Sequence, residues 1–383
     1  MIRDEFLVYG NPAIEEAEIE EVVDSLRSGW IGTGPKVALF EQEFKNYVAA
    51  EYAVAVSSCT AALHLSMIVS GIGHGDEVIT TPMTFCATAN AILHTGAVPV
   101  FVDIDPKTMN IDPELVEKAI TKRTKAILPV HFAGRPCDMK NLLRIANDYG
   151  LHLIEDCAHA IETTCEMGKV GSIGDLSCFS FYVTKNVVTA EGGMITTNRK
   201  DWADKLKIYA LHGMSRDAWK RYSDDGFRHY EVLVPGFKYN MTDIQASLGI
   251  HQLRRVNKSL ARRNEIWERY NNEFNELEVK TPTNSPSDVV HARHLYTILI
   301  DENFVGCNRN TFQERMQRNN IGTGIHYTAL HLQPFYENKF NFQKGDFPAA
   351  EYISDRTLSL PLGPKMTDHD VSDVISAVKQ CCH

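Results

Sequence analysis

The amino-acid sequence predicts an α/β fold with a mostly parallel central sheet flanked by helices, followed by a smaller C-terminal α/β domain. Short β-prone runs alternate with helix-like segments from residue 53 to residue 154, as in parallel strands joined by crossover helices. A long helical stretch, 242–277, then leads into a final segment, and 383 residues suffice for two hydrophobic cores. We therefore expect a large domain over residues 1–250, and a helical linker with a small domain over residues 251–383.

The first half of the chain supplies the alternating elements. Each predicted strand is a short run rich in aliphatic and β-branched residues, and each predicted helix carries apolar residues at helical spacing. Gly71 and Gly73 end the first helix, while Asp112 can cap a helix that has Pro113 in its first turn. The predicted strands are 53–56, 77–81, 98–102, 126–130 and 152–154, and the predicted helices are 60–69, 85–93, 113–120 and 139–149.

The pattern changes after residue 176. Two strand-like runs, 177–182 and 193–197, are joined by a short polar link that contains Lys185. The stretch 214–235 is polar and poorly periodic, which favours a long functional loop. The helical stretch that follows forms either one helix or two, with predicted runs over 242–256 and 260–277.

The composition limits the class of protein. A formal net charge of -10 argues against dedicated nucleic-acid binding, which requires a basic surface. The nine cysteines are odd in number and form no CxxC pair, so neither a disulfide framework nor a metal site is expected. The tail Cys381–His383 has metal-binding residue types, but a frayed end is the simpler interpretation.

The sequence shows neither the pattern of a signal peptide nor that of a membrane-spanning segment. Its start is acidic where a signal peptide would be apolar, and the longest apolar-rich stretch, 52–72, is interrupted by polar residues. We therefore expect a cytoplasmic enzyme without membrane contact.

Lys185 is the first candidate for chemistry. Most lysines are solvated surface residues, but this one lies between apolar, β-branched runs on both sides. Partial desolvation lowers the pKa of a lysine amine and makes the free amine a nucleophile. The surroundings of Lys185 therefore favour an amine that can form a Schiff base with an aldehyde cofactor.

Three further segments fit such a site, and each also has a simpler interpretation. Asp156 should stand at the carboxyl end of a strand, where it can pair with a protonated pyridine nitrogen or cap a following helix. The run 57–61 lies between a strand and a helix, so its hydroxyls and amides can bind phosphate or cap the helix. Phe85 follows a strand and can stack on a planar ring or belong to the core. No GxGxxG fingerprint competes as a dinucleotide site, because 71–76 lacks the spacing and follows a helix.

These residues lie in motifs that resemble a known family. The sequence is similar to the sugar-nucleotide aminotransferases of the DegT/DnrJ/EryC1/StrS family, which are fold-type-I pyridoxal-phosphate enzymes. The similarity covers almost the whole chain. Its most specific motifs are the lysine motif FSFYVTKN and the acidic motif EDCAH, and it extends to GWIGTGPK, SCTAALH, EGGM, GFKYN and GIH.

The resemblance implies a role for each motif residue. Lys185 would form a Schiff base with pyridoxal 5′-phosphate, Asp156 would pair with the pyridine nitrogen, and Phe85 would stack on the ring. His159 matches a position near the ring, and His326 matches a position near the substrate. Contacts to the cofactor phosphate segment are implied for Ser58, Cys59, Thr60, Ala61, Ser180 and Asn240, and substrate contacts for Trp30, Thr33, Lys36 and Arg216.

The resemblance also implies the partners. Asn240 matches a residue that the family supplies to the phosphate from the neighbouring subunit, which implies a homodimer with shared active sites. Some relatives replace the lysine with histidine and act as dehydratases, so Lys185 favours transamination, with glutamate as the amino donor. Basic residues in or near the polar loop are candidates for a substrate diphosphate, although each is more simply explained as solvated. They are Lys36, Arg216, Lys220, Arg221 and Arg228.

The substrate implied by the resemblance is a nucleotide-linked 4-keto sugar. The sequence looks most like enzymes that aminate C4 of UDP-linked 4-keto pentoses, and it shares features with enzymes of the pseudaminic acid route that act on UDP-linked 4-keto-6-deoxy-hexoses. The product would be a 4-amino-sugar nucleotide for a surface polysaccharide or lipid. Phe85 stands where the pentose enzymes are expected to carry tryptophan. A hexose, a C3-keto sugar, a pyridoxal-phosphate dehydratase and a non-catalytic relative therefore stay open as alternatives.

Overall fold

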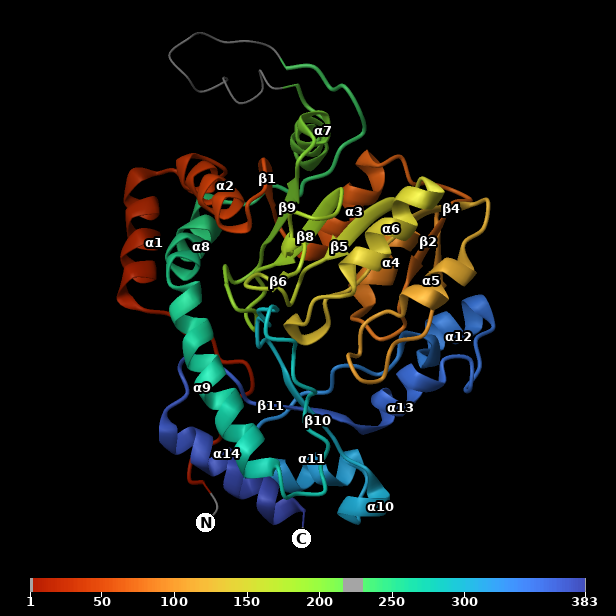
Figure 1. Ribbon diagram of the computed structural model, residues 1–383. Coiled ribbons are helices and arrows are strands. Elements are labelled where there is room, and N and C mark those ends of the chain that lie inside the picture. The colour runs from red at the N-terminus through yellow and green to blue at the C-terminus, as the bar shows by residue number, and fades with distance from the viewer. Residues whose placement is uncertain (1–2, 216–229, 383) are drawn as a thin grey trace.

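The computed structural model describes residues 3–215 and 230–382, and its centre is a seven-stranded sheet (Figure 1). The strand order is β1–β9–β8–β5–β4–β2–β3. Neighbouring strands from β8 to β3 run parallel, whereas β9 is antiparallel to both β1 and β8. The expected mostly parallel sheet is confirmed. The strands are β1 (Tyr52–Val56), β2 (Glu77–Thr80), β3 (Val98–Phe101), β4 (Thr124–Ile127), β5 (His152–Asp156), β8 (Leu176–Ser180) and β9 (Gly193–Thr197).

Helices connect these strands, and two of them begin at predicted caps. The side chain of Asp112 accepts a hydrogen bond from the Glu114 amide at the start of α5, with Pro113 in the first turn. The described residues contain no helix that is both long and apolar enough to cross a membrane. The helices of this part are α1 (Glu16–Ser28), α2 (Pro35–Val48), α3 (Cys59–Val69), α4 (Cys86–His94), α5 (Pro113–Ala119), the 3-10 turn η1 (Phe132–Gly134), α6 (Met139–Tyr149), α7 (Lys200–Ala210) and α8 (Asp243–Arg254).

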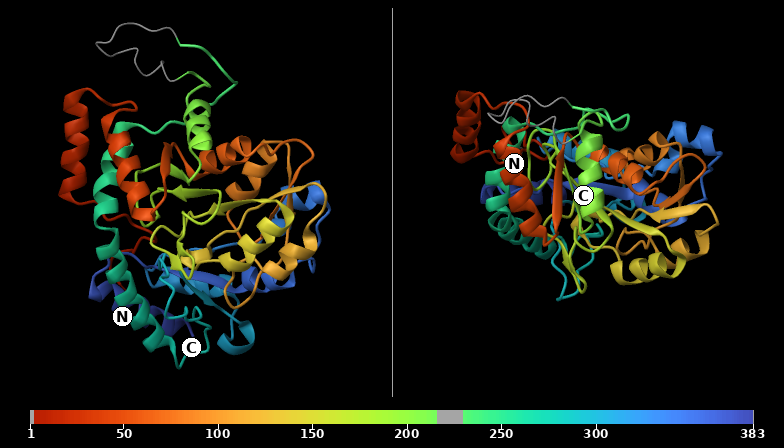
Figure 2. Two further views of the ribbon diagram at one scale, coloured as in Figure 1. Left: turned by 45° about the horizontal axis from the view of Figure 1, so that its top comes forward. Right: turned by 90° about the horizontal axis from the view of Figure 1, so that it is seen from above.

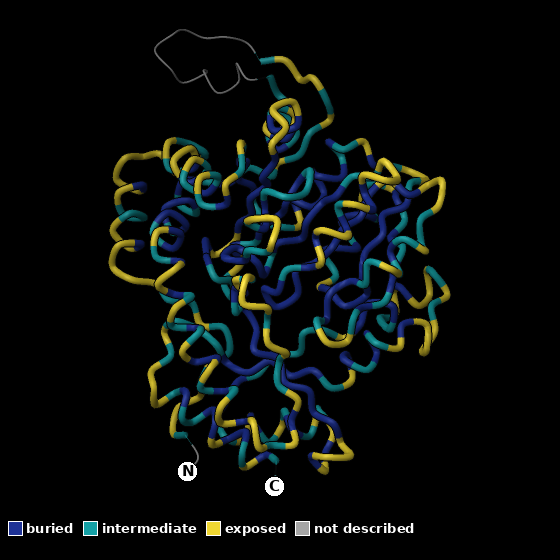
Figure 3. Tube along the Cα trace, viewed as in Figure 1, coloured by how far each residue is buried: buried dark blue, intermediate teal, exposed yellow. Residues whose placement is uncertain are grey.

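Both faces of the sheet are covered, which explains why its strands read as almost continuous apolar runs. Successive side chains point to opposite faces. Val78 of β2 and Ile154 of β5 pack in the cluster that contains α3 and α7, whereas Ile79 and Leu153 pack against α5 and α6. The sheet is correspondingly buried along most of its length (Figure 3).

The C-terminal part forms a second cluster around a small antiparallel sheet. Trp267 and Tyr270 of the long helix α9 (Val256–Phe274) pack edge-on against Tyr296, with ring centroids 4.7 and 5.0 Å apart. The N-terminal segment joins this cluster, because Leu7 bridges to Ile321, so both chain ends lie at one end of the molecule (Figure 2). The elements of this part are β10 (Tyr296–Leu299), β11 (Thr357–Leu360), α10 (Glu302–Val305), α11 (Arg309–Arg318), the 3-10 turn η3 (Leu330–Leu332), α12 (Pro334–Phe340), α13 (Pro348–Arg356) and α14 (Asp368–Cys381). A short hairpin of β6 (Thr164–Cys165) and β7 (Gly168–Lys169) lies between β5 and β8 in the chain.

The sequence left open whether the helical stretch after residue 242 forms one helix or two. The helical stretch after residue 242 is two helices, because it breaks at Arg255, whose backbone is non-helical (φ −105°, ψ 6°). Helix α8 therefore stays with the large sheet, while α9 runs into the C-terminal cluster.

Candidate active site

The four motifs singled out in the sequence meet at one cavity of about 510 Å³. Asp156 ends β5 and Ser180 ends β8, and parallel strands place their ligands beyond such carboxyl ends. Further parts of the wall come from the start of α4 and from the segment around His326. The predicted site residues that line the cavity are Ser58, Cys59, Thr60, Phe85, Asp156, His159, Ser180, Lys185 and His326.

Lys185 lies in the loop between β8 and β9, where its amide donates a hydrogen bond to the Tyr182 carbonyl oxygen (2.8 Å). Burial lowers the pKa of its amine from 10.5 to about 8, although the nearby Cys59 and Asp156 oppose this shift. The free amine that nucleophilic attack requires is therefore far more abundant near neutral pH than it is for a solvated lysine.

Asp156 is buried and held by two hydrogen bonds. The Thr88 hydroxyl donates to one carboxylate oxygen (2.8 Å), and the Ala158 amide donates to the other (3.1 Å). Burial raises the pKa of Asp156, whereas Thr88, Ala158 and Lys185 favour its charged form. The residues that directly follow Asp156 form turns, so it caps no helix and remains free to face the cavity.

The start of α3 serves as both cap and cradle. The Ser58 hydroxyl accepts a hydrogen bond from the Ala61 amide (3.1 Å), so the predicted capping is present. The amides of Cys59 and Thr60 belong to the first helical turn, which has no intrahelical acceptors for them. They can therefore donate to an anion such as a phosphate, and the helix dipole favours it. Ala61 itself is buried and does not line the cavity.

A glycine makes this cradle possible. A Cβ atom on Gly193, at the start of β9, would lie 2.5 Å from the Ser58 carbonyl carbon and 2.7 Å from the Cys59 nitrogen. Such contacts are impossible without backbone movement, so β9 approaches the helix start as closely as it does only because residue 193 lacks a side chain.

Phe85 stands at the mouth of the cavity. Its backbone precedes the first turn of α4, its side chain is 58% exposed, and its ring lies 6.1 Å from that of Tyr327. A core role is therefore wrong for Phe85, and its ring is accessible for stacking.

His159 is held as a neutral imidazole. Its Nδ1 accepts a hydrogen bond from the Ala133 amide (3.2 Å), so its proton must sit on Nε2, which lies 3.1 Å from the Tyr327 hydroxyl. Burial and the nearby Lys185 lower the pKa of His159 far below its usual value. His159 can thus position groups by hydrogen bonding, but it is unsuited to carrying a charge here.

Sequence reasoning missed three residues of this region. Tyr327 and Thr88 line the cavity, and His294 packs on His159 with ring centroids 4.3 Å apart. His294 lies far along the chain from the other motifs, so no local pattern points to it. Tyr327 follows the GIH motif directly, and that adjacency was the one available signal.

His326 lines the same cavity as Lys185. Its Nδ1 is 2.8 Å from the Ser359 hydroxyl of β11. Burial, reinforced by the charge of Lys185, lowers its pKa to about 4. The C-terminal part of the chain thus contributes a neutral hydrogen-bonding group to the site.

Other predicted residues lie elsewhere in the subunit. Trp30, Thr33 and Asn240 line a separate hollow of about 740 Å³, where the Asn240 amide donates to the Thr33 hydroxyl (2.6 Å). Lys36 is ion-paired with Glu21 and Asp24 of α1. The structure does not bring any of these to the Lys185 cavity of the same chain. The loop candidates Arg216, Lys220, Arg221 and Arg228 lie outside the described residues.

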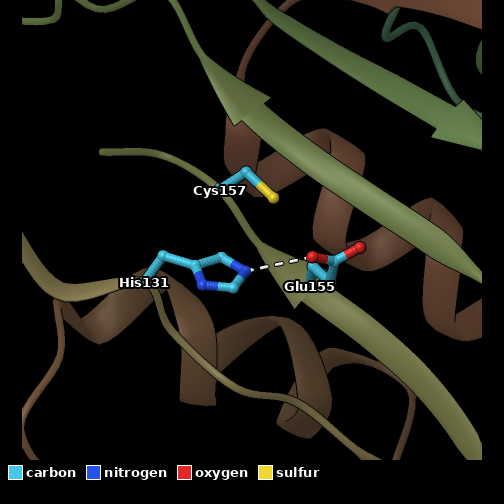
Figure 4. A group of neighbouring side chains, drawn as sticks. All are labelled: His131, Glu155 and Cys157. Atoms are coloured by element: carbon cyan, nitrogen blue, oxygen red, sulfur yellow. Dashed lines mark hydrogen bonds and ion pairs between the residues drawn. The ribbon is translucent and has the colours of Figure 1, made fainter. Parts of the chain in front are cut away.

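A buried cluster behind Asp156 has metal-binding residue types, but its carboxylate and imidazole are already hydrogen-bonded within the protein. His131, Glu155 and Cys157 lie together in Figure 4. Both Glu155 oxygens are occupied, one by His131 (3.1 Å) and one by the Ser177 hydroxyl (2.8 Å) and the Gly174 amide (2.7 Å). The other imidazole nitrogen accepts from the Cys137 amide. The cluster instead supports the site, because the His131 amide binds the Asp156 carbonyl oxygen.

A model of the DegT/DnrJ/EryC1/StrS aminotransferase family matches residues 12–379 of the chain. The chain belongs to that family. Among curated relatives, an uncharacterized protein of Methanocaldococcus jannaschii is 54% identical and covers 99% of this chain and 98% of its own. The spore coat polysaccharide biosynthesis protein SpsC of Bacillus subtilis is 50% identical over 98% of this chain and 97% of its own.

Solved structures of the family confirm the fold. The pyridoxal-phosphate form of Spr1654 from Streptococcus pneumoniae, described as a sugar aminotransferase, is 34% identical, covers 98% of both chains and superposes with a TM-score of 0.91. PseC of Helicobacter pylori, an aminotransferase of pseudaminic acid biosynthesis, is 27% identical, covers 99% of both chains and has a TM-score of 0.90. The expected fold-type-I aminotransferase architecture is thus confirmed.

These findings make the protein an aminotransferase of this family with pyridoxal phosphate as its cofactor, as expected. The residues present fit that group. An amine of lowered pKa, a buried carboxylate and a helix start with unpaired amides line one cavity, and they match the aldehyde, ring nitrogen and phosphate of the cofactor in chemical character.

Proposed function

We propose that this aminotransferase moves the amino group of glutamate to C4 of a nucleotide-linked 4-keto sugar. The sequence motifs named above favour UDP as the nucleotide. The observation that carries the proposal is the meeting of Lys185, Asp156 and the start of α3 at one cavity. The named relatives support a sugar substrate, because SpsC belongs to polysaccharide biosynthesis and PseC to amino-sugar biosynthesis.

The protein side chains divide the work between holding and proton movement. When bound, pyridoxal phosphate supplies an electron-accepting ring. Lys185 would hold the cofactor covalently, Asp156 would pair with its ring nitrogen, and the first amides of α3 would bind its phosphate. Nζ of Lys185 is the basic atom suited to take a proton from the amino donor and return it. His159 and Tyr327 orient groups in the cavity through their shared hydrogen bond.

The hollow that contains Asn240 supports a homodimer. Asn240, Trp30 and Thr33 face a cavity other than that of Lys185 in their own subunit, so they suit a site completed by a second copy. The exposed Trp30 and Ile31 side chains, each 52% accessible, support burial against such a copy. The nine free cysteines support a location in the cytoplasm, because thiols stay reduced there.

The substrate proposal retains the hexose and pentose alternatives. A UDP-linked 4-keto-6-deoxy-hexose is favoured over a 4-keto pentose by the likeness to PseC and by phenylalanine at position 85. A C3-keto sugar and a dehydratase reaction are the remaining alternatives, and they differ in product rather than in cofactor.

The test is an assay of the purified holoenzyme with glutamate and a panel of UDP- and TDP-linked keto sugars, with products identified by mass spectrometry and NMR. Formation of a 4-amino sugar and 2-oxoglutarate is expected. Lys185→Ala should lose all turnover. The matched control is Lys169→Ala, since burial also lowers the pKa of Lys169 to about 8 but its amine lies over the Tyr47 ring, away from the cavity. Deoxygenated product or turnover by Lys185→Ala would contradict the proposal.

A further inference from the structure

A second cavity, of about 590 Å³, lies apart from the Lys185 cavity. Its walls come from the segment after β3, from η1 and α9, from β10 and from the start of α13. Among the described residues that line it there is no aspartate or glutamate, although the chain has a net charge of -10. The ionisable residues with basic side chains on its wall are Lys107, Arg135, Lys280 and His291.

Arg135 contributes a buried positive charge without an ion-pair partner among residues 3–215 and 230–382. It is 9% exposed, and its guanidinium donates to the carbonyl oxygens of Thr283 and Asn284. These carbonyl oxygens satisfy two of its N–H donors, and Asp105 acts on its charge only through space, without an ion pair. Because burying a charge is unfavourable unless an opposite charge is near, a bound anion would stabilise this arrangement.

Arg293 adds a second, partly buried positive charge behind the wall. Its guanidinium lies over the Trp267 ring (4.3 Å to the centroid), and Trp267 lines the cavity. Nε donates to Asn264 (3.1 Å), but the buried Nη1 has no hydrogen-bond partner. Burial and, to a smaller extent, the like charge of Arg135 lower the pKa of Arg293 to about 10.

His291 presents a fixed donor to the same space. Its Nδ1 accepts a hydrogen bond from the Arg293 amide (2.9 Å), so the neutral ring carries its proton on Nε2. Burial and the charges of Arg293 and Arg135 lower its pKa far below the usual value. His291 is therefore a neutral N–H donor on the cavity wall.

Acidic groups near the cavity leave this positive character in place. Asp105 and Glu268 act on Arg135 and Arg293 through space without forming an ion pair with either. Asp103 does not line the cavity, and its two oxygens accept hydrogen bonds from the Ala349 and Ala350 amides at the start of α13 (2.8 Å each).

We propose that this cavity binds a phosphate-bearing small molecule. Lys107, Arg135, Lys280 and His291 come from four different segments, so their donors approach one space from several directions. A tetrahedral phosphate accepts hydrogen bonds from several directions at once, whereas a carboxylate accepts mainly within its plane. The apolar remainder of the wall, which includes Met109, Phe132 and Trp267, suits the body of an organic phosphate, and the volume lies in the range of small-molecule sites.

The test uses the holoenzyme after borohydride treatment, so that the cofactor fills its own phosphate site. Isothermal titration calorimetry in chloride-free buffer would measure uridine 5′-monophosphate, inorganic phosphate and succinate. The test variant is Lys107→Gln/Lys280→Gln, which removes two exposed charges of the wall. The control is Lys118→Gln/Lys122→Gln, which changes the net charge equally on an exposed surface away from the cavity. Thermal unfolding would verify that both variants are folded.

The expected result is binding of uridine 5′-monophosphate and inorganic phosphate that weakens by about tenfold or more in the test variant and stays unchanged in the control. Uridine 5′-monophosphate can also bind at the substrate site. Binding there should be the same in both variants, so only the affinity that differs between them is assigned to this cavity. Equal phosphate and nucleotide binding by all three proteins would overturn the proposal, and so would tighter binding of succinate than of either phosphate. Because the assay measures no turnover, its outcome is independent of which sugar the enzyme aminates.

Discussion

Burial in one site shifts the pKa values of Lys185 and Asp156 in opposite directions. Burial lowers the pKa of the lysine amine and raises that of the carboxyl, since it disfavours the charged form of each. Each residue partly offsets the effect on the other, and Thr88 adds a hydrogen bond that favours the carboxylate. The balance leaves an amine that loses its proton easily beside an acid held in place.

The lowered pKa of Lys185 gives a first prediction. In the apoprotein, acetylation of Lys185 by limiting acetic anhydride, read by mass spectrometry, should rise with pH and reach half its maximum at about 8. The sign follows because only the free amine reacts, and the free form dominates above the pKa. The exposed Lys118, read in the same digest, supplies the reference for reagent decay. A midpoint near the ordinary lysine value of 10.5 would show that the amine is solvated.

A second prediction concerns Thr88. Thr88→Val removes the hydroxyl that favours the charged form of Asp156, so the pKa of Asp156 should rise further. Loss of a hydrogen bond to a charged group is worth about 1.5–3 kcal/mol, so cofactor affinity should fall by about 10- to 100-fold. Fluorescence titration of the apoprotein with pyridoxal phosphate measures it. Thr163→Val is the control, since Thr163 is equally buried but donates to the Gly134 carbonyl. Equal losses in both variants would count against the assignment.

Local sequence could predict the residues whose motif surrounds them, and no others. Asp156 was identified because it follows an apolar strand-like run, and Lys185 because apolar runs flank it on both sides, and the structure brings both to one cavity. His294 and Tyr327 come from a distant part of the chain, and only the packing of the C-terminal part against the sheet brings them near His159. Such neighbours depend on tertiary packing, which residue types alone do not encode.

Among the elements, the contact between α3 and β9 has the greatest effect on the site. The sheet places β9 between β1 and β8, so the strand after Lys185 runs beside the strand that leads into α3. The sequence predicted the strands and the helix, with ends shifted by a few residues in cases such as β4. It did not predict the strand order, because antiparallel and parallel neighbours both bury the same apolar runs. The helices α1, α2 and α7 were also not predicted.

The close approach of Gly193 to Ser58 yields a third prediction. Gly193→Ala would place a Cβ against backbone atoms, and overpacking of this kind costs about 1–3 kcal/mol. The shift should fall on the first turn of α3, so thermal stability and cofactor affinity should decrease together. Gly73→Ala is the matched control, since a Cβ there meets no atom within 4 Å. If both variants behave like the parent protein, the approach is looser than the structure indicates.

At the scale of the whole molecule, a buried ion pair joins α9 to the large sheet's loops. Arg263 of α9 pairs with Glu162, and both side chains are almost inaccessible, at 2% and 1%. Glu162 also accepts from the Asn186 side chain (2.8 Å), whose oxygen lies 3.0 Å from Nδ1 of His294. The predicted division into residues 1–250 and 251–383 remains a prediction, and limited proteolysis would test it.

This pair leads to a fourth prediction. Arg263→Met should lower the free energy of unfolding by about 3–5 kcal/mol, because it leaves the Glu162 carboxylate buried without its cation. Urea unfolding would measure the loss, and adding Glu162→Gln should restore part of it. The neighbouring Arg262→Met breaks solvent-exposed pairs with Asp368 and Glu265 and one hydrogen bond to the Met366 carbonyl oxygen, for which at most about 2 kcal/mol is expected. Equal effects of the two arginines would refute the prediction.

Asn186 is the residue next to Lys185 in the chain, and its amide is fully engaged: both N–H donors are used, on Glu162 and on the Ala292 carbonyl. The backbone that carries the reactive amine is therefore anchored to a helix whose other end packs among the C-terminal aromatic side chains. If the cofactor orders the loop that carries Lys185, these contacts should also reduce the motion of α9. Filling the site with cofactor should accordingly slow amide hydrogen exchange along α9, far from any atom that the cofactor touches.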